Sequence, residues 1–164
     1  MRVGDRIWRL RSVLGLPERA RDAENSLSAA VRALAYYAER SESIRDAGSD
    51  IARRYGSDPG LFRADAGAFE GRFPLWERFL EQALVNHMFF TQFPYIGVGP
   101  EEAVLSLAVT AGLLRVLAAG CGAQDRSGVI DICAAAFRLI AHTPFARSTA
   151  AALGGADGYG MTAL

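Results

Sequence analysis

The sequence predicts an all-α protein, a single-domain helical bundle of about five to seven helices. Apolar residues recur at three- and four-residue spacing in several stretches, as they do on one face of a helix. No stretch of useful length alternates between apolar and polar residues, as a strand would. Hydrophobic residues make up 51% of the 164 residues, which is enough for a core. The predicted helical domain covers residues 1–153, and the glycine-rich residues 154–164 form a predicted flexible tail.

The first half of the chain is predicted to form three helices. A short amphipathic helix spans residues 5–14 and ends at a glycine and a proline. A long helix then starts between Asp22 and Ser26 and runs toward Arg54. It has an apolar stripe on one face and mixed charges on the other, which is typical of a solvated face. Residues 55–59 read YGSDP and predict a turn, and a short helix follows at residues 61–69.

The second half is predicted to contain longer helices. One runs from Pro74 to about Phe93, where the residue before a proline disfavours the α conformation. The next begins at Pro100 with two carboxylates in its first turn and reaches about Gly120. Two further helices are expected, from Asp125 or Ser127 to His142 and from Thr143 to Leu153.

The stretch from Ala103 to Cys121 has nearly the length of a membrane span. Arg115 and two glycines interrupt its apolar character, so we interpret it as a buried core helix and expect no membrane span. The N-terminus lacks the apolar segment of a signal peptide, which favours the cytoplasm. Cys121 and Cys133 are too few for a four-cysteine metal site, and a disulfide between them stays open.

Charge composition excludes several classes of function. Acidic and basic residues number 18 each, so no overall positive field attracts nucleic acid, and we expect no nucleic-acid partner. All basic residues are arginine, which removes Schiff-base chemistry, a lysine general base and the phosphate-binding loop lysine. The residues that bear on function are therefore individual charged residues within apolar helices.

Two arginines and one glutamate form the first group of candidate binding residues. Arg115 and Arg138 each lie in an otherwise apolar helical run, so each guanidinium needs a partner or must reach water. Glu81 lies on a third helix, four residues after Glu77, and is the expected partner of one of them. A structural ion pair between helices is favoured over a clamp for a substrate carboxylate.

The two histidines, His87 and His142, complete the set of candidate residues. They do not have the close spacing of a metal-binding pair, so we expect no metal site and interpret both as histidines at the helix surface or core edge. Aromatic residues are dense between residues 69 and 95. They are predicted to form core, although they could also line a pocket or a partner-binding groove near Trp76 and Phe90.

Residues 80–95, LEQALVNHMFFTQFPY, resemble a segment in the carboxy-terminal half of the flagellin lysine-N-methylase family. The run Leu113-Leu114-Arg115 and the later Phe137, Arg138 and His142 follow in the same order, so that the resemblance covers residues 75–153. Ala83, Ala141 and Thr143 depart from the family pattern. The resemblance implies the helical part of an enzyme that uses S-adenosylmethionine and carries a cysteine-rich iron–sulfur portion. This chain has no such cysteine cluster, so neither cofactor is expected in it.

Three functions follow as hypotheses. The first is a helical domain related to that methylase, which binds a protein substrate such as flagellin or a cysteine-rich partner domain and is not active alone. The second is a non-enzymatic helical module that binds a protein or a small molecule. The third is a small enzyme built around Glu81, His87 and His142. The sequence assigns no catalytic residue and leaves the oligomeric state open.

Overall fold

Seven α-helices and no strand make up the described part of the chain, which is residues 2–17, 23–94 and 99–142 of a computed structural model. The all-α prediction is confirmed, and the helix number lies within the predicted range. The helices are α1 (Val3–Val13), α2 (Ala23–Ala38), α3 (Arg45–Ser57), α4 (Pro59–Arg72), α5 (Trp76–Thr91), α6 (Pro100–Gly120) and α7 (Arg126–His142). The predicted helix from Thr143 to Leu153 and the tail lie outside the described residues.

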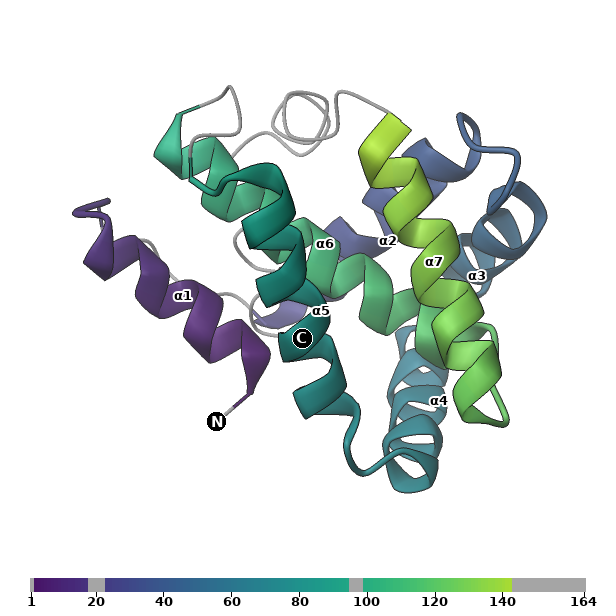
Figure 1. Ribbon diagram of the computed structural model, residues 1–164. Coiled ribbons are helices and arrows are strands. Elements are labelled where there is room, and N and C mark those ends of the chain that lie inside the picture. The colour runs from purple at the N-terminus through teal and green to yellow at the C-terminus, as the bar shows by residue number, and fades with distance from the viewer. Residues whose placement is uncertain (1, 18–22, 95–98, 143–164) are drawn as a thin grey trace.

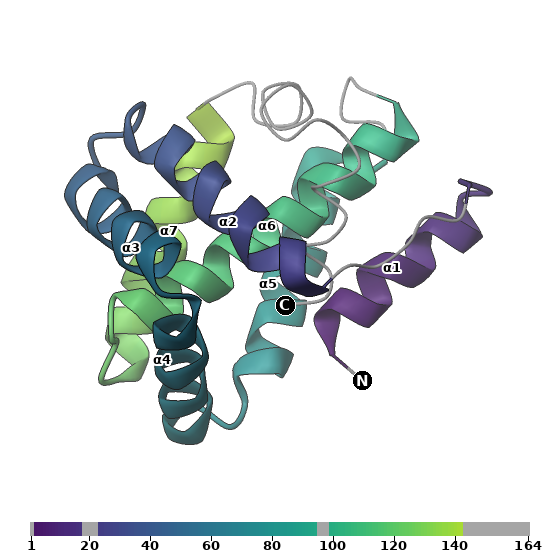
Figure 2. The same cartoon turned by 180° about the vertical axis from the view of Figure 1, so that it is seen from behind.

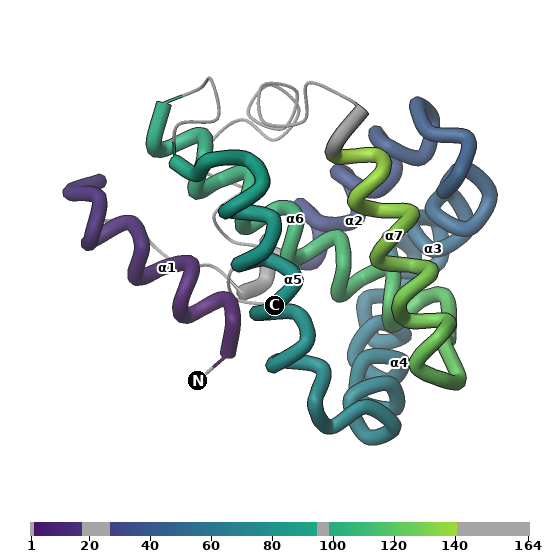
Figure 3. Tube along the Cα trace, in the orientation of Figure 1, coloured from purple at the N-terminus to yellow at the C-terminus, as the bar shows by residue number. Residues whose placement is uncertain are grey.

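Helix α6 is the centre of the fold and packs against each of the other six helices (Figure 1). Helices α5 and α7 lie on one side of it, and α2 and α3 lie on the other side, as the reverse view shows (Figure 2). The Cα trace places α1 on one flank and α3 with α4 on the opposite flank (Figure 3). The other helices are therefore layers around one axial helix.

The composition of α6 explains its position. Every residue from Ala103 to Ala119 is buried, because the helix is apolar on all sides and no face of it favours water. It is the one helix among the described residues that is long and apolar enough to cross a membrane, and 94% of its most apolar window is buried inside the fold. Its buried Thr110 hydroxyl donates to the carbonyl of Ser106 at 2.8 Å. The interpretation of this stretch as a core helix is confirmed.

The predicted long helix from Asp22 to Arg54 is wrong, because the structure divides it into α2 and α3. The chain leaves the helix after Ala38, and the two halves then pack against each other. Gly48 makes the close approach possible, since a Cβ atom there would lie 3.0 Å from the Cβ of Ala38. The apolar stripe that predicted one helix is thus the surface through which two helices meet.

Helix ends elsewhere follow local signals. Asp58 separates α3 from α4, and its carboxylate accepts a hydrogen bond of 2.8 Å from the N–H of Gly60. Helix α5 starts at Trp76, two residues after the predicted start, and ends at Thr91. Gln92 follows in the left-handed conformation, with φ of 58°. The limits of α6 agree with the prediction.

The C-terminal end of α6 provides a test of this close packing. A Cβ atom at Gly120 would lie within 2.6 Å of the buried Ile51 of α3, so Gly120→Ala should lower the free energy of unfolding by about 1–3 kcal/mol. Gly71→Ala is the matched control, because nothing lies near its Cβ position, and it should raise stability by about 0.5–1 kcal/mol. Urea denaturation of both variants measures this, and an equal effect of the two substitutions would contradict the packing.

Candidate functional site

A cluster of charges centres on Arg115 of α6, whose side chain is only 7% exposed. Its guanidinium donates to Glu77 of α5 and lies 3.6 Å from the carboxylate of Glu70 of α4. The second oxygen of Glu77 accepts from the N–H of Val3 at 2.9 Å, and Arg2 lies 3.8 Å from Glu70. One buried guanidinium therefore connects α6 with α4, α5 and the start of α1.

The pKa of Glu77 is set by its burial, its hydrogen bond and the positive charges around it. Burial alone would raise the pKa, because it disfavours the charged carboxylate. The hydrogen bond from Val3 and the positive charges of Arg115 and Arg2 act in the opposite direction and together hold the pKa of Glu77 below its ordinary value. The carboxylate is therefore ionised at neutral pH and acts as the counter-ion of Arg115.

A cleft of about 930 Å³ opens beside this cluster, between α2 and α4. Its aromatic and apolar lining comes from five helices and includes Leu27, Val31, Tyr55, Phe62, Ala66, Phe69, Trp76 and Ala119. Its polar lining consists of Arg2, Ser28, Arg32, Arg63, Glu70 and Arg115. Among the described lining residues, four arginines thus face one carboxylate.

The arginines of the cleft differ in their partners. Arg115 and Arg2 share Glu70. Arg32, on the α2 wall, donates to the hydroxyl of Ser28 at 3.0 Å. Arg63, on the α4 wall, forms no ion pair with any carboxylate that the structure describes, and its side chain is exposed. Of these arginines, Arg63 thus presents to the cleft a positive charge that no described carboxylate balances.

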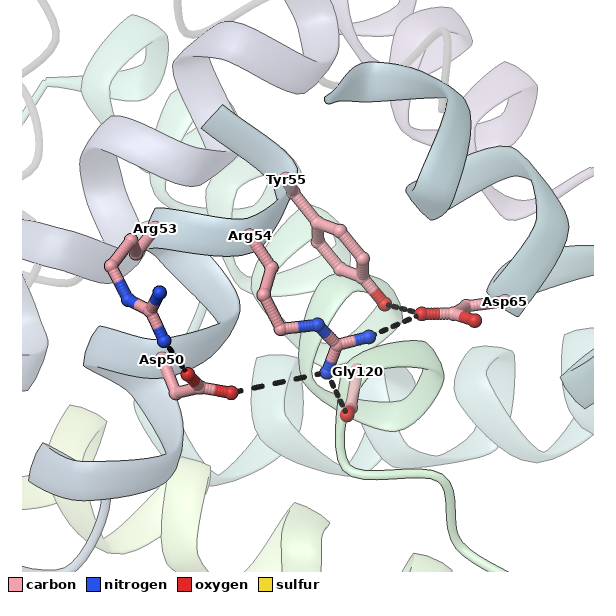
Figure 4. A network of polar contacts seen from close by, with 6 residues as sticks. All are labelled: Asp50, Arg53, Arg54, Tyr55, Asp65 and Gly120. Atoms are coloured by element: carbon pink, nitrogen blue, oxygen red, sulfur yellow. Dashed lines mark hydrogen bonds and ion pairs between the residues drawn. The ribbon is translucent and has the colours of Figure 1, made fainter. Parts of the chain in front are cut away.

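A polar network fixes one wall of the cleft and the end of α6 (Figure 4). Asp65 of α4 accepts hydrogen bonds from the Tyr55 hydroxyl at 2.9 Å and from Arg54 at 2.8 Å. Arg54 also reaches the carbonyl of Gly120 at 3.5 Å, at the C-terminal end of α6. Burial, and then the contact with Asp65, raise the pKa of Tyr55, so its hydroxyl stays protonated and serves as a donor.

Glu81 does pair with an arginine of another helix, but neither of the two expected candidates, Arg115 and Arg138, is that partner. Glu77, and not Glu81, pairs with Arg115. Glu81 instead forms an ion pair with Arg6 of α1 at the half-exposed surface between the two helices. The expectation of an ion pair between helices is confirmed for Arg115. Glu77 can take the place of Glu81 because positions four residues apart lie on the same face of α5.

The other predicted residues do not join Arg115. Arg138 is exposed on α7, so the hypothesis of a buried pair there is wrong. His87 is half-buried and packs its ring against Phe137 of α7, with centroids 5.5 Å apart, and burial lowers its pKa. His142 is the last residue of α7, and its side chain lies outside the described part of the structure. Glu81, His87, Arg115 and Arg138 therefore form no common site.

The remaining candidates for chemistry are also separate. Cys121 and Cys133 are both free, the first exposed and the second buried, and burial raises the pKa of the Cys133 thiol to about 11. No group of three histidine, cysteine or carboxylate residues within the described ranges could hold a metal ion. Trp76 is buried whereas Phe90 is 82% exposed, and Phe90 does not line the cleft beside Trp76.

Arg115 and Trp76 are cleft residues that the sequence singled out, whereas most of the other lining residues were not predicted. Phe62 and Arg63 belong to a helix with weak amphipathic character, and Arg32 appeared as one of many charges on a solvated face. One usable signal in the sequence is a basic residue that has no acidic neighbour on its own helix. Arg63 is such a residue, since no carboxylate lies three or four positions away from it. Even that signal could not have placed α2 opposite α4.

Comparison with known proteins adds no relative. No protein-family model matches the chain, and no significant match was found among curated proteins or solved structures. The resemblance to flagellin lysine-N-methylase therefore stays a prediction from the sequence.

The ion pair of Arg115 predicts a large effect of its removal. Arg115→Met keeps most of the apolar stem but leaves Glu77 without its main cation, which should cost about 2 kcal/mol. This is below the usual cost for a fully buried pair because Glu77 is 34% exposed. Arg138→Met, the same change at an exposed arginine, should stay within about 0.5 kcal/mol. Urea denaturation measures the free energy of unfolding of both variants. Equal losses would show that the ion pair of Arg115 does not stabilise the fold.

The lowered pKa of Glu77 predicts a pH dependence. Its ionised form contributes stability that is complete above the unfolded pKa, near 4.5, and is lost as the pH falls through the lower folded pKa. The free energy of unfolding, measured from neutral pH down to about pH 3, should therefore fall less steeply in Glu77→Gln than in the parent. Glu42→Gln, at an exposed position, should keep the parental slope, and a parental slope in Glu77→Gln would refute the assignment.

Proposed function

We propose that the chain is a helical binding module that holds a small amphipathic anion in the cleft between α2 and α4. The observation that carries this proposal is the lining of the cleft, where four arginines face one carboxylate around an apolar floor. Guanidinium groups bind carboxylate, sulfate and phosphate through paired hydrogen bonds. The apolar floor suits the hydrocarbon or aromatic body of the same ligand.

The size of the cleft supports a small-molecule ligand. A volume of about 930 Å³ lies within the range of pockets that enclose drug-sized molecules. Aromatic side chains such as Phe62 and Trp76 line it together with aliphatic ones. Arg32 and Arg63 come from opposite walls, so a negatively charged group between the walls would meet a cation on each side.

The partners of the polar residues favour binding over catalysis. Glu70, the carboxylate among the described lining residues, forms ion pairs with Arg115 and Arg2. The hydroxyl of Tyr55 donates to Asp65. Because Glu70 and Tyr55 hold contacts within the fold, they support a role in shaping the site and not in proton transfer.

The proposal does not depend on the family resemblance. That resemblance covers residues 75–153, whereas most of the cleft comes from α2, α3 and α4, which precede it. A role beside flagellin or a cysteine-rich partner domain, with S-adenosylmethionine and an iron–sulfur cluster in that partner, remains a separate proposal that rests on the sequence alone.

Calorimetric titration with three naphthyl compounds tests the proposal. Naphthyl phosphate should bind more tightly than neutral naphthol, and the naphthylmethyl ammonium ion should bind least. Ala66→Trp, which fills the cleft, and Arg63→Glu, which reverses a wall charge, should each weaken phosphate binding about tenfold or more. Arg45→Glu is the matched control, because Arg45 is exposed on α3 and does not line the cleft.

Two results would contradict this function. The first is equal binding of the anionic and cationic compounds, since charge would then play no part. The second is parental affinity in Ala66→Trp, since the ligand would then lie elsewhere. Thermal melts of each variant establish that the fold is retained.

A further inference from the structure

A second groove lies on the other side of Trp76, where the connection between α4 and α5 meets the start of α7. Its volume is about 510 Å³. Its apolar lining is Phe73, Pro74, Leu75, Trp76, Phe79 and Val129, and its polar lining is Arg72, Arg78, Gln82 and Arg126. Apart from the shared Trp76, none of these residues belongs to the first cleft.

Positive charge surrounds this groove. Arg72 comes from the end of α4, Arg78 from α5 and Arg126 from the start of α7, and all three are exposed. None of them forms an ion pair with a carboxylate of the described ranges, and the described lining includes no acidic residue. Three exposed guanidinium groups around an apolar depression, without a carboxylate of the described residues to balance them, attract negative charge.

An exposed strip, which carries Leu75, Val85 and Phe89 together with Arg78 and Gln82, continues from the groove along the outer face of α5. Positions 75, 78, 82, 85 and 89 recur at three- and four-residue spacing, so they share one face of the helix. On that face Leu75 is 70% exposed, Val85 41% and Phe89 80%. The strip is about 21 Å long, from the helical rise per residue, and therefore extends well beyond the groove itself.

We propose that this basic-ended strip docks an acidic amphipathic helix of another protein. The length of the strip matches about four turns of a partner helix, whereas a small molecule would cover only the groove. The apolar face of the partner would cover Leu75, Val85 and Phe89. Its carboxylates would meet Arg72, Arg78 and Arg126 at one end of the strip, which fixes the direction in which the partner helix lies.

A second copy of this chain fits the strip less well. A symmetric dimer would place the same surface of both copies face to face. Each copy would then bring three further arginines and no described carboxylate from the groove, and the described carboxylate beside the strip, Glu81, is already paired with Arg6. Charge complementarity thus favours a different protein that supplies the acidic residues.

Fluorescence anisotropy with designed helical peptides tests the proposal. The probe is a peptide of about 16 residues with leucines at three- and four-residue spacing and glutamates beside them, and its partner peptide carries lysines in place of the glutamates. The glutamate peptide should bind, with an affinity that falls as salt is added, and the lysine peptide should not.

Matched variants assign the binding to this surface. Arg78→Glu combined with Arg126→Glu should weaken the glutamate peptide about tenfold or more, and so should Leu75→Ser combined with Phe89→Ser. Arg45→Glu and Val13→Ser change an exposed arginine and an exposed apolar residue elsewhere, and both should bind as the parent does. Arg63→Glu should also bind as the parent, which separates this surface from the first cleft.

Three outcomes would overturn the proposal. They are equal binding of the glutamate and lysine peptides, parental affinity in both groove variants, and no measurable binding of the glutamate peptide to the parent. Light scattering of the parent and of Leu75→Ser adds a further check, because a dimer that the substitution dissociates would show that a second copy occupies the strip.

Discussion

Placing Arg115 inside an apolar helix is the constraint on which the arrangement of the other helices depends. Because α6 is apolar on all sides, burial of its surface does not by itself decide which side faces which neighbour. A guanidinium that is 7% exposed does decide it, since leaving this charge without counter-ions would cost several kcal/mol. Glu77 and Glu70 supply the counter-ions, so Arg115 sets the rotation of α6 relative to α5 and α4.

How far the sequence predicts the fold depends on whether the signal is local. The limits of α6 follow from Pro100 at its first position, the carboxylates beside it and Gly120 at its end, all of which act within a turn of the residues they affect. The division between α2 and α3 does not follow in this way. Its apolar stripe is equally compatible with one long helix, and the close packing of the two halves, which Gly48 permits, is a tertiary effect.

The candidate site shows the same limit at the level of single residues. A buried, paired Arg115 is predictable, because an arginine in an apolar run needs a partner wherever the run is buried. The choice between Glu77 and Glu81 is not predictable, since both lie on one face of α5 and only the offset between two packed helices distinguishes them. Arg63 becomes part of a site only because α2 lies across from α4, and no spacing within α4 contains that information.

Trp76 is shared by the cleft and the groove, so a substitution of this residue cannot affect one of the two surfaces alone. Its buried indole lines both the cleft and the groove, with the ring of Phe69 at 5.1 Å on the cleft side and that of Phe79 at 5.8 Å on the groove side. A substitution of Trp76 would disturb both surfaces together with the core between them. Arg63 and Arg78 each line only one surface and lie at exposed positions, so changes in their charge act on one surface at a time.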